Sequence, residues 1–254
     1  MDDVEILPAG KSSSEHRQAH SAHGSKKKMP KWVGASIVAL LVVVALFLVF
    51  RNIEPSKDNT LELTLNDLHA LNYEGKLDEE RGYVFEEHSF VRKDNLWWTV
   101  TIVNDHPTHI PLHYGPRDVV NVSVLGSITT EFDKGQAIYM AIDPEYTNKH
   151  YTLGLMELNN NIVKGFGRKP VGSCSRNHTI CTDYPVVSCN NTQGKPVIEL
   201  RPSGIAQVEL DGSCILLSGE GEEMALAATR LIYLWYDIMP IKAERNHSVF
   251  VPFG

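Results

Sequence analysis

The longest run without a charged residue is Trp32–Phe50, nineteen residues of which only Gly34 and Ser36 interrupt the apolar character. At 1.5 Å per residue, a helix of this length measures about 28 Å, close to the hydrocarbon thickness of a bilayer. A buried helix of a soluble domain usually carries polar residues on at least one face. The apolar region of a cleavable signal peptide spans only about 7–15 residues and ends at small residues. The pattern therefore predicts an uncleaved signal-anchor, a single transmembrane helix.

Basic residues are distributed unequally around this predicted helix. Those close to its ends are Lys26, Lys27, Lys28 and Lys31 on the N-terminal side and Arg51 and Lys57 on the C-terminal side. Because lysine and arginine accumulate on the cytoplasmic side, we expect a cytoplasmic N-terminus and an extracytoplasmic C-terminal part. Residues 1–31 contain few apolar side chains, so we expect a disordered cytoplasmic tail. Residues 51–60 form the predicted polar linker.

Beyond this linker, the apolar positions follow the periods of short strands and helices. Aromatic and β-branched residues predict strands over 83–91 and 96–104, joined by a hairpin turn. Leucines within 65–71 have the spacing of a short helix, for which Thr64 is the predicted N-cap. Three prolines within 105–116 predict an irregular segment or an edge strand.

The second half of the external part alternates predicted strands with two predicted helices. The strands are expected at 119–124, 137–142, 185–189, 196–200, 206–210 and 213–218. One helix is expected over 146–164, ending at Gly165, and the other over 220–239. This alternation predicts an extracytoplasmic α+β or α/β domain over 61–239, with a β-rich N-terminal portion and two packed helices. Residues 240–254 are expected to form a peripheral C-terminal tail.

The charge of the chain separates its two ends. The formal net charge is −7, of which residues 1–31 contribute +2 and the remainder −9. A basic tail suits the anionic inner surface of a membrane. An acidic external part argues against nucleic acid, which requires a basic surface. The partners that we expect are therefore the lipid bilayer and a protein of the membrane or envelope.

All four cysteines, Cys174, Cys181, Cys189 and Cys214, lie in the external part. An even number of cysteines outside the cytoplasm predicts two disulfide bonds. Three pairings are possible, and the spacing favours Cys174–Cys181 closing a short loop and Cys189–Cys214 joining two strands. The closely spaced cysteine pairs of a zinc site are missing, so we expect no metal or other cofactor here.

Four Asn-x-Ser/Thr sequences also follow the predicted helix, which indicates a glycoprotein. Their asparagines are Asn121, Asn177, Asn190 and Asn246. Asn177 lies between the first two cysteines and Asn190 directly follows the third, so we expect both on surface turns.

Three histidines, His106, His109 and His113, form the main candidate for chemistry. They could hold a metal if their loop folds back, and the alternative is a surface loop with solvated histidines. The chain has no Gly-x-Ser-x-Gly nucleophile elbow and no P-loop. Glycines within 218–222 stand beside glutamates that would repel a phosphate, so we expect a tight strand-to-helix turn there. The sequence thus offers no catalytic residue and favours a protein that is not an enzyme.

Three C-terminal segments resemble a group of uncharacterised archaeal single-pass membrane-anchored proteins. These segments are Tyr184–Cys189, Asp211–Gly219 and Met224–Met239, and the stretch that contains them is about a quarter of the chain. The resemblance implies an archaeal-type cell surface and supports the Cys189–Cys214 pairing. We therefore expect a binding protein or a structural, accessory subunit of a membrane or envelope complex. The alternative is a membrane-tethered extracytoplasmic hydrolase, metal-dependent through the three histidines.

Overall fold

The computed structural model describes residue 44 and residues 63–241. The tail over 1–31, the linker over 51–60, Asn246 and nearly all of the predicted helix over 32–50 lie outside the described residues, as does 242–254. No helix within the described stretches combines the length and the apolar character that crossing a membrane demands. The chain divides into two units, 1–60 and 61–254, and every element below belongs to the second.

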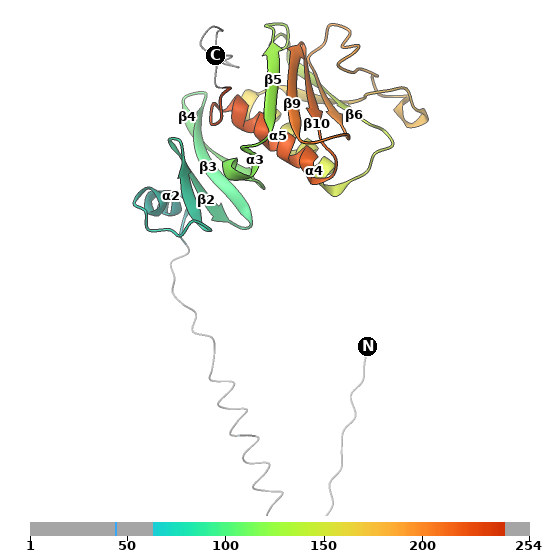
Figure 1. Ribbon diagram of the computed structural model, residues 1–254. Helices are drawn as coiled ribbons and strands as arrows, with labels where there is room; N and C mark the ends of the chain where they lie inside the picture. The colour runs from blue at the N-terminus through green and yellow to red at the C-terminus, as the bar shows by residue number, and fades with distance from the viewer. Residues whose placement is uncertain (1–43, 45–62, 242–254) are drawn as a thin grey trace, which may run out of the picture. The chain divides into compact units, whose positions relative to one another are not determined.

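The first part of this unit is a four-stranded antiparallel sheet with one helix packed on it (Figure 1). Its strands follow one another in the order of the sequence: β1 (Gly82–Phe85), β2 (His88–Lys93), β3 (Leu96–Val103) and β4 (His106–Leu112). The helix is α2 (Leu65–Tyr73), and Thr64 caps it as the sequence predicts, through a reciprocal bond with Asp67.

The turns of this sheet explain one wrong prediction. Segment 83–91 is not a single strand, because a turn at Glu86 and Glu87 divides it into β1 and β2. The predicted turn before β3 is confirmed: both Asp94 and Asn95 have positive φ values, as tight hairpins require. Predicted segment 105–116 contains β4, an edge strand of the sheet.

The second part is a mixed six-stranded sheet in the order β5-β9-β10-β8-β6-β7. Its strands are β5 (Ser123–Ile128), β6 (Ala137–Ile142), β7 (Lys169–Cys174), β8 (Val197–Arg201), β9 (Gln207–Gly212) and β10 (Cys214–Ser218). Strands β10, β8, β6 and β7 are parallel, whereas β9 is antiparallel to β10 and parallel to β5. The helices are α3 (Pro116–Val119), α4 (Lys149–Phe166) and α5 (Glu222–Trp235), with a 3-10 turn at Thr179–Cys181. The predicted mixed α/β domain with two packed helices is therefore confirmed.

Helix α5 lies at the centre of the core. It packs against α4 so closely that a Cβ on Gly154 would lie 3.1 Å from the Cβ of Ala228. It also contacts β9 and β10 of the larger sheet. From the smaller sheet, the ring of Phe90 meets the ring of Tyr233 edge-on at 5.7 Å. Because partners surround α5, nearly all of its side chains are buried, and not only the predicted stripe.

The long helix α4 requires two corrections to the predicted boundaries. The helix predicted over 146–164 begins after Asn148, whose side chain accepts backbone N–H groups of the first turn. It ends at Gly167, which has a left-handed φ of 62°, and not at Gly165. Gly165 lies inside the helix, where a Cβ would overlap the hydroxyl of Tyr236. Close packing, and not the helix end, therefore explains Gly165.

The remaining strand predictions are partly confirmed. The predicted strand over 137–142 coincides with β6, and β8, β9 and β10 lie within two residues of their predicted ranges. Helix α3 and β5 replace the strand predicted over 119–124. The strand predicted over 185–189 is reduced to an isolated bridge. The sequence pattern does not predict β7, since Pro170 and Gly172 interrupt its apolar residues.

Both disulfide bonds favoured by the cysteine spacing are formed, Cys174–Cys181 and Cys189–Cys214. The second bond attaches the loop after β7 to β10. The buried carboxylate of Glu199 accepts the backbone N–H of Cys189 at 2.7 Å, which fixes the same loop from inside. Asn121, Asn177 and Asn190 are exposed, as carbohydrate attachment requires.

Candidate binding site

The three histidines of the sequence analysis do not converge. Because β4 is extended, His106 is exposed at its start and His109 faces α2, with its ring centroid 6.0 Å from that of His69. His113 follows the strand and bonds to Glu157 of α4. Among the residues that the structure describes, no group of three or more His, Cys, Asp or Glu side chains could hold a metal ion.

Glu157 is a polar centre that sequence reasoning missed. Its side chain is buried, and one oxygen accepts the backbone N–H of His113 at 3.0 Å and pairs with its Nδ1 at 2.7 Å. The other oxygen accepts the hydroxyl of Thr229 of α5 at 3.3 Å. The carboxylate thus joins the end of the smaller sheet to both long helices. In sequence, Glu157 has the spacing of an ordinary polar position on a helix.

Tyr114 follows His113 and lies beside the pair that His113 forms with Glu157. The hydroxyl of Tyr114 donates to Glu222 at 3.0 Å and lies 3.4 Å from Nδ1 of His150. Burial and the bond to Glu222 raise the pKa of Tyr114. Its carbonyl accepts the hydroxyl of Tyr233 at 2.6 Å. Each of these polar groups has a hydrogen-bond partner among the others. The arrangement therefore links the segment after β4 to α4 and α5.

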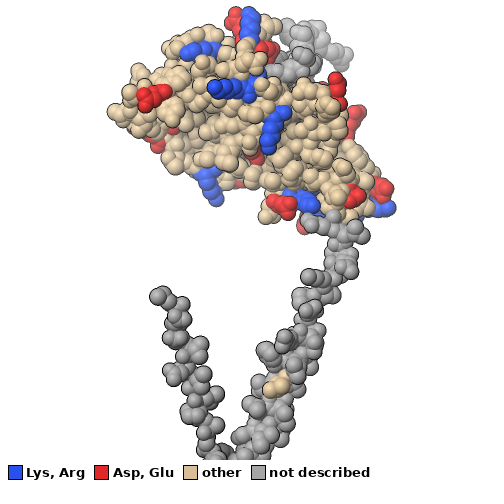
Figure 2. All heavy atoms as spheres, turned by 180° about the vertical axis from the view of Figure 1, so that it is seen from behind, with Lys and Arg blue, Asp and Glu red and all other residues tan. Residues whose placement is uncertain are grey.

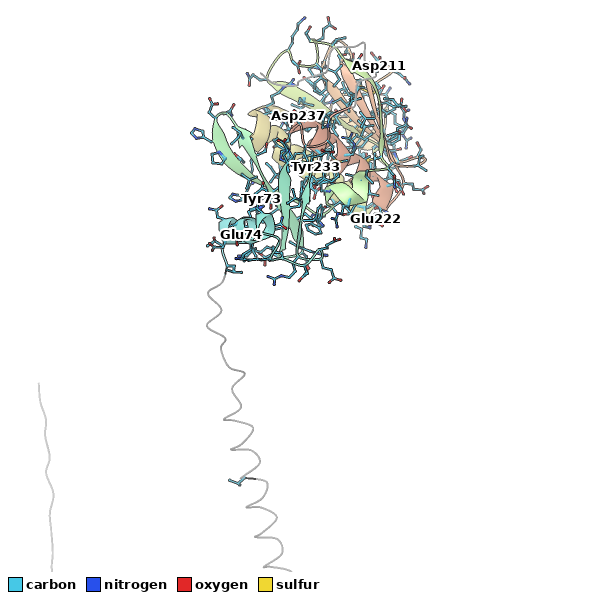
Figure 3. The ribbon with its side chains drawn as sticks, turned by 60° about the vertical axis from the view of Figure 1, so that its left-hand side comes forward. Tyr73, Glu74, Asp211, Glu222, Tyr233 and Asp237 are labelled. Atoms are coloured by element: carbon cyan, nitrogen blue, oxygen red, sulfur yellow. A yellow bond between two sulfur atoms is a disulfide. The ribbon has the colours of Figure 1, made fainter. Side chains whose placement is uncertain are left out.

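A cavity of about 700 Å³ lies at the C-terminal end of α5, whereas Glu222 lies at the N-terminal end. Figure 3 shows the two ends of the helix, with Asp237 just past one end, Glu222 at the other and Tyr233 between them. The β1–β2 turn, the start of β5 and the segment after α5 surround the cavity, whose apolar walls include Phe85, Val124 and Ile238. The volume lies within the range of about 300–1,000 Å³ that is typical of small-molecule sites.

Arg230 of α5 contributes the most unusual group of this cavity. Its exposed fraction is only 7%. Nη1 donates to the carbonyl of Met239 at 2.8 Å, and no carboxylate of the described part of the chain pairs with the guanidinium. Burial lowers its pKa to about 10, so Arg230 remains charged at neutral pH. Sequence reasoning missed it, although it is the single charged residue between Met224 and Trp235.

The rim of the cavity has the opposite charge. Glu86, Glu87 and Asp237 are exposed and line the opening together with His88. Burial lowers the pKa of His88, and the charges of Glu87 and Asp237 act in the opposite direction. The site therefore combines a cationic floor, apolar walls and an acidic, solvated edge. On the face in Figure 2, by contrast, basic and acidic side chains are interspersed without a continuous basic patch.

No protein-family model, curated protein or solved structure matches this chain. The assignment of the cavity as a candidate binding site therefore depends on its own geometry and charge.

Proposed function

We propose that this protein is a single-pass membrane protein of an archaeal-type cell surface, with a cytoplasmic N-terminus and an extracytoplasmic domain over 61–239. The domain acts by binding, as an accessory subunit of a membrane or envelope complex. The uncharged run over 32–50 supports the anchor. The two disulfide bonds and the exposed sequon asparagines support the location outside the cytoplasm.

The observation that carries the binding role is the cavity with Arg230 at its floor. Arg230 has no carboxylate partner among the described residues, and burying an unpaired guanidinium costs stability because the charge loses its hydration. A well-formed cavity with a few convergent polar groups is the usual form of a ligand site. A molecule of complementary charge that enters the cavity would offset the cost of this buried charge.

A pull-down tests this role. The full-length chain is extracted from its native membrane in mild detergent, and the proteins that accompany it are identified by mass spectrometry. The cavity variant is Val124→Arg, which places a charged side chain in the wall. The matched control is Leu125→Arg on the same strand, because Leu125 is exposed and does not line the cavity.

We expect a stoichiometric membrane partner with the wild type and with Leu125→Arg, and its loss with Val124→Arg. A wild-type chain that is recovered alone would contradict the accessory role. A partner retained by Val124→Arg would show that the cavity does not contribute to the complex.

One observation favours a second function, a membrane-tethered hydrolase. The buried carboxylate of Glu157 holds Nδ1 of half-exposed His113, an arrangement that leaves Nε2 available as a general base. Ester hydrolysis by the purified chain, measured with p-nitrophenyl acetate, separates the two functions. Hydrolysis that is lost in His113→Ala and kept in His106→Ala, a variant of an exposed histidine, would favour the hydrolase, and a wild type without hydrolysis would favour binding.

A further inference from the structure

We infer that the cavity at the end of α5 takes a small organic carboxylate, an apolar body with one carboxylate group, and that Arg230 is the counter-ion of that group. The inference rests on the proposed binding role, since it names the chemistry of the ligand. The binding role and the ligand class can fail independently. The role is tested by the proteins that accompany the chain, whereas the ligand class is tested by titration with small molecules.

The donors of Arg230 are available to a ligand. Of the five N–H groups of its guanidinium, the bond from Nη1 to Met239 is the one made to described protein atoms. Arg168 is buried to the same 7%, but its Nε and Nη1 are enclosed and have no hydrogen-bond partner among the described residues. Neither Nε nor Nη2 of Arg230 is enclosed in this way. Because Arg230 lines the cavity and these two nitrogens are not among the enclosed atoms, we infer that they are accessible from the cavity.

Two adjacent guanidinium nitrogens suit a carboxylate. The planar guanidinium bonds a carboxylate through two parallel N–H···O contacts, and burial makes such charge-assisted bonds strong. Phe85, Val124 and Ile238 offer apolar surface to the rest of the molecule. A ligand with a carboxylate at one end and an apolar body would satisfy the floor and the walls together.

The rim restricts the charge of the ligand. Exposed Glu86, Glu87 and Asp237 repel further negative charge at the opening. A phosphate monoester carries nearly two charges at neutral pH, and a polyanion carries many more. A monoanion is therefore favoured over both classes.

Benzoate and benzamide form a matched pair of probes, because they share a ring and differ in charge. The full-length chain, in phosphatidylcholine nanodiscs, is titrated with each by calorimetry, and phenyl phosphate serves as the dianionic comparison. We expect saturable binding of one benzoate per chain and binding of benzamide weaker by about tenfold or more. Phenyl phosphate is expected to bind less tightly than benzoate.

Variants identify the counter-ion. Arg230→Met is expected to weaken benzoate binding by about tenfold or more, whereas Arg230→Lys, which keeps the charge but loses the planar pair of donors, weakens it less. The matched control is Arg168→Met, which removes an equally buried arginine outside the cavity and leaves benzoate binding unchanged.

Four outcomes would overturn the inference: no saturable benzoate binding, equal affinity for benzamide, tighter binding of phenyl phosphate, or unchanged benzoate affinity in Arg230→Met. The comparison of benzoate with benzamide needs the wild type alone, so it remains decisive if Arg230→Met does not fold. Binding of benzoate only after removal of residues 242–254 would assign the cavity to that segment and overturn the inference as well.

Discussion

Acidification should destabilise the domain through one buried histidine, His69 of α2. Its exposed fraction is 7%, Nδ1 lies 2.9 Å from the hydroxyl of Ser89, and Nε2 is enclosed without a hydrogen-bond partner among the described residues. Burial is the main cause that lowers the pKa of His69 to about 4, and the charge of His109 acts in the same direction.

The direction of this pH effect follows from which state of the protein, folded or unfolded, binds a proton first as the pH falls. In the unfolded chain, His69 titrates near 6.5, so below that pH the unfolded state takes up a proton that the folded state refuses. The free energy of unfolding therefore falls as the pH drops from about 6.5 to about 4 and is unaffected by His69 above that window. With these two pKa values, the loss at pH 4.5 is about 2.5 kcal/mol.

The assay is urea unfolding of the full-length chain, followed by tryptophan fluorescence at pH 7 and pH 4.5. His69→Gln keeps a polar group near Ser89 but cannot titrate, so we expect it to lose about 2.5 kcal/mol less than the wild type over this interval. His106→Gln is the control, because His106 is exposed, and it should follow the wild type. Equal losses in the wild type and in His69→Gln would refute the reasoning.

Three further predictions concern stability at neutral pH, measured by the same urea unfolding. Replacing Cys189 and Cys214 by serine should cost about 3.5 kcal/mol, as expected for a loop of 25 residues, and a cost below about 1 kcal/mol would contradict this. Gly165→Ala should cost about 1–3 kcal/mol, because its Cβ would overlap a buried tyrosine hydroxyl, whereas Gly172→Ala, with its nearest neighbour at 3.9 Å, should change little. Equal effects of the two alanines would refute this packing. Glu157→Ala should cost about 2–3 kcal/mol because several donors lose their acceptor, and an unchanged midpoint would show that water replaces it.

Local signals in the sequence predict those elements that their own residues specify. The reciprocal side-chain bonds of Thr64 start α2, and the paired turn residues Asp94 and Asn95 separate β2 from β3. Strand β7 cannot be predicted from its own residues, which include Pro170 and Gly172, because its parallel pairing with β6 specifies it. The burial of α5 on all sides also cannot be predicted from the sequence of the helix. One of the elements that bury it is the smaller sheet, which contacts it through Phe90.

The candidate site was less predictable than the fold. A lone arginine in the apolar stretch between Met224 and Trp235 is a signal that sequence reasoning can use, because a buried charge requires a partner. The cavity itself gives no such signal, since its wall combines Phe85, Val124 and Ile238 from distant parts of the chain. The histidine cluster was suggested by proximity in sequence, and the extended backbone of β4 separates its members.

The position of β5 imposes an order of events on the newly made chain. Strands β1 to β4 pair only with their neighbours in sequence, so this meander can form as soon as it is synthesised. β5 follows after the short helix α3, yet among the described strands it pairs with β9 alone, where Ser123 lies opposite Gln207. Until that distant strand emerges, β5 has two open edges and a protruding Leu125, the features that invite pairing between chains. A nascent chain of this protein is therefore most prone to aggregate while the ribosome translates the residues between β5 and β9.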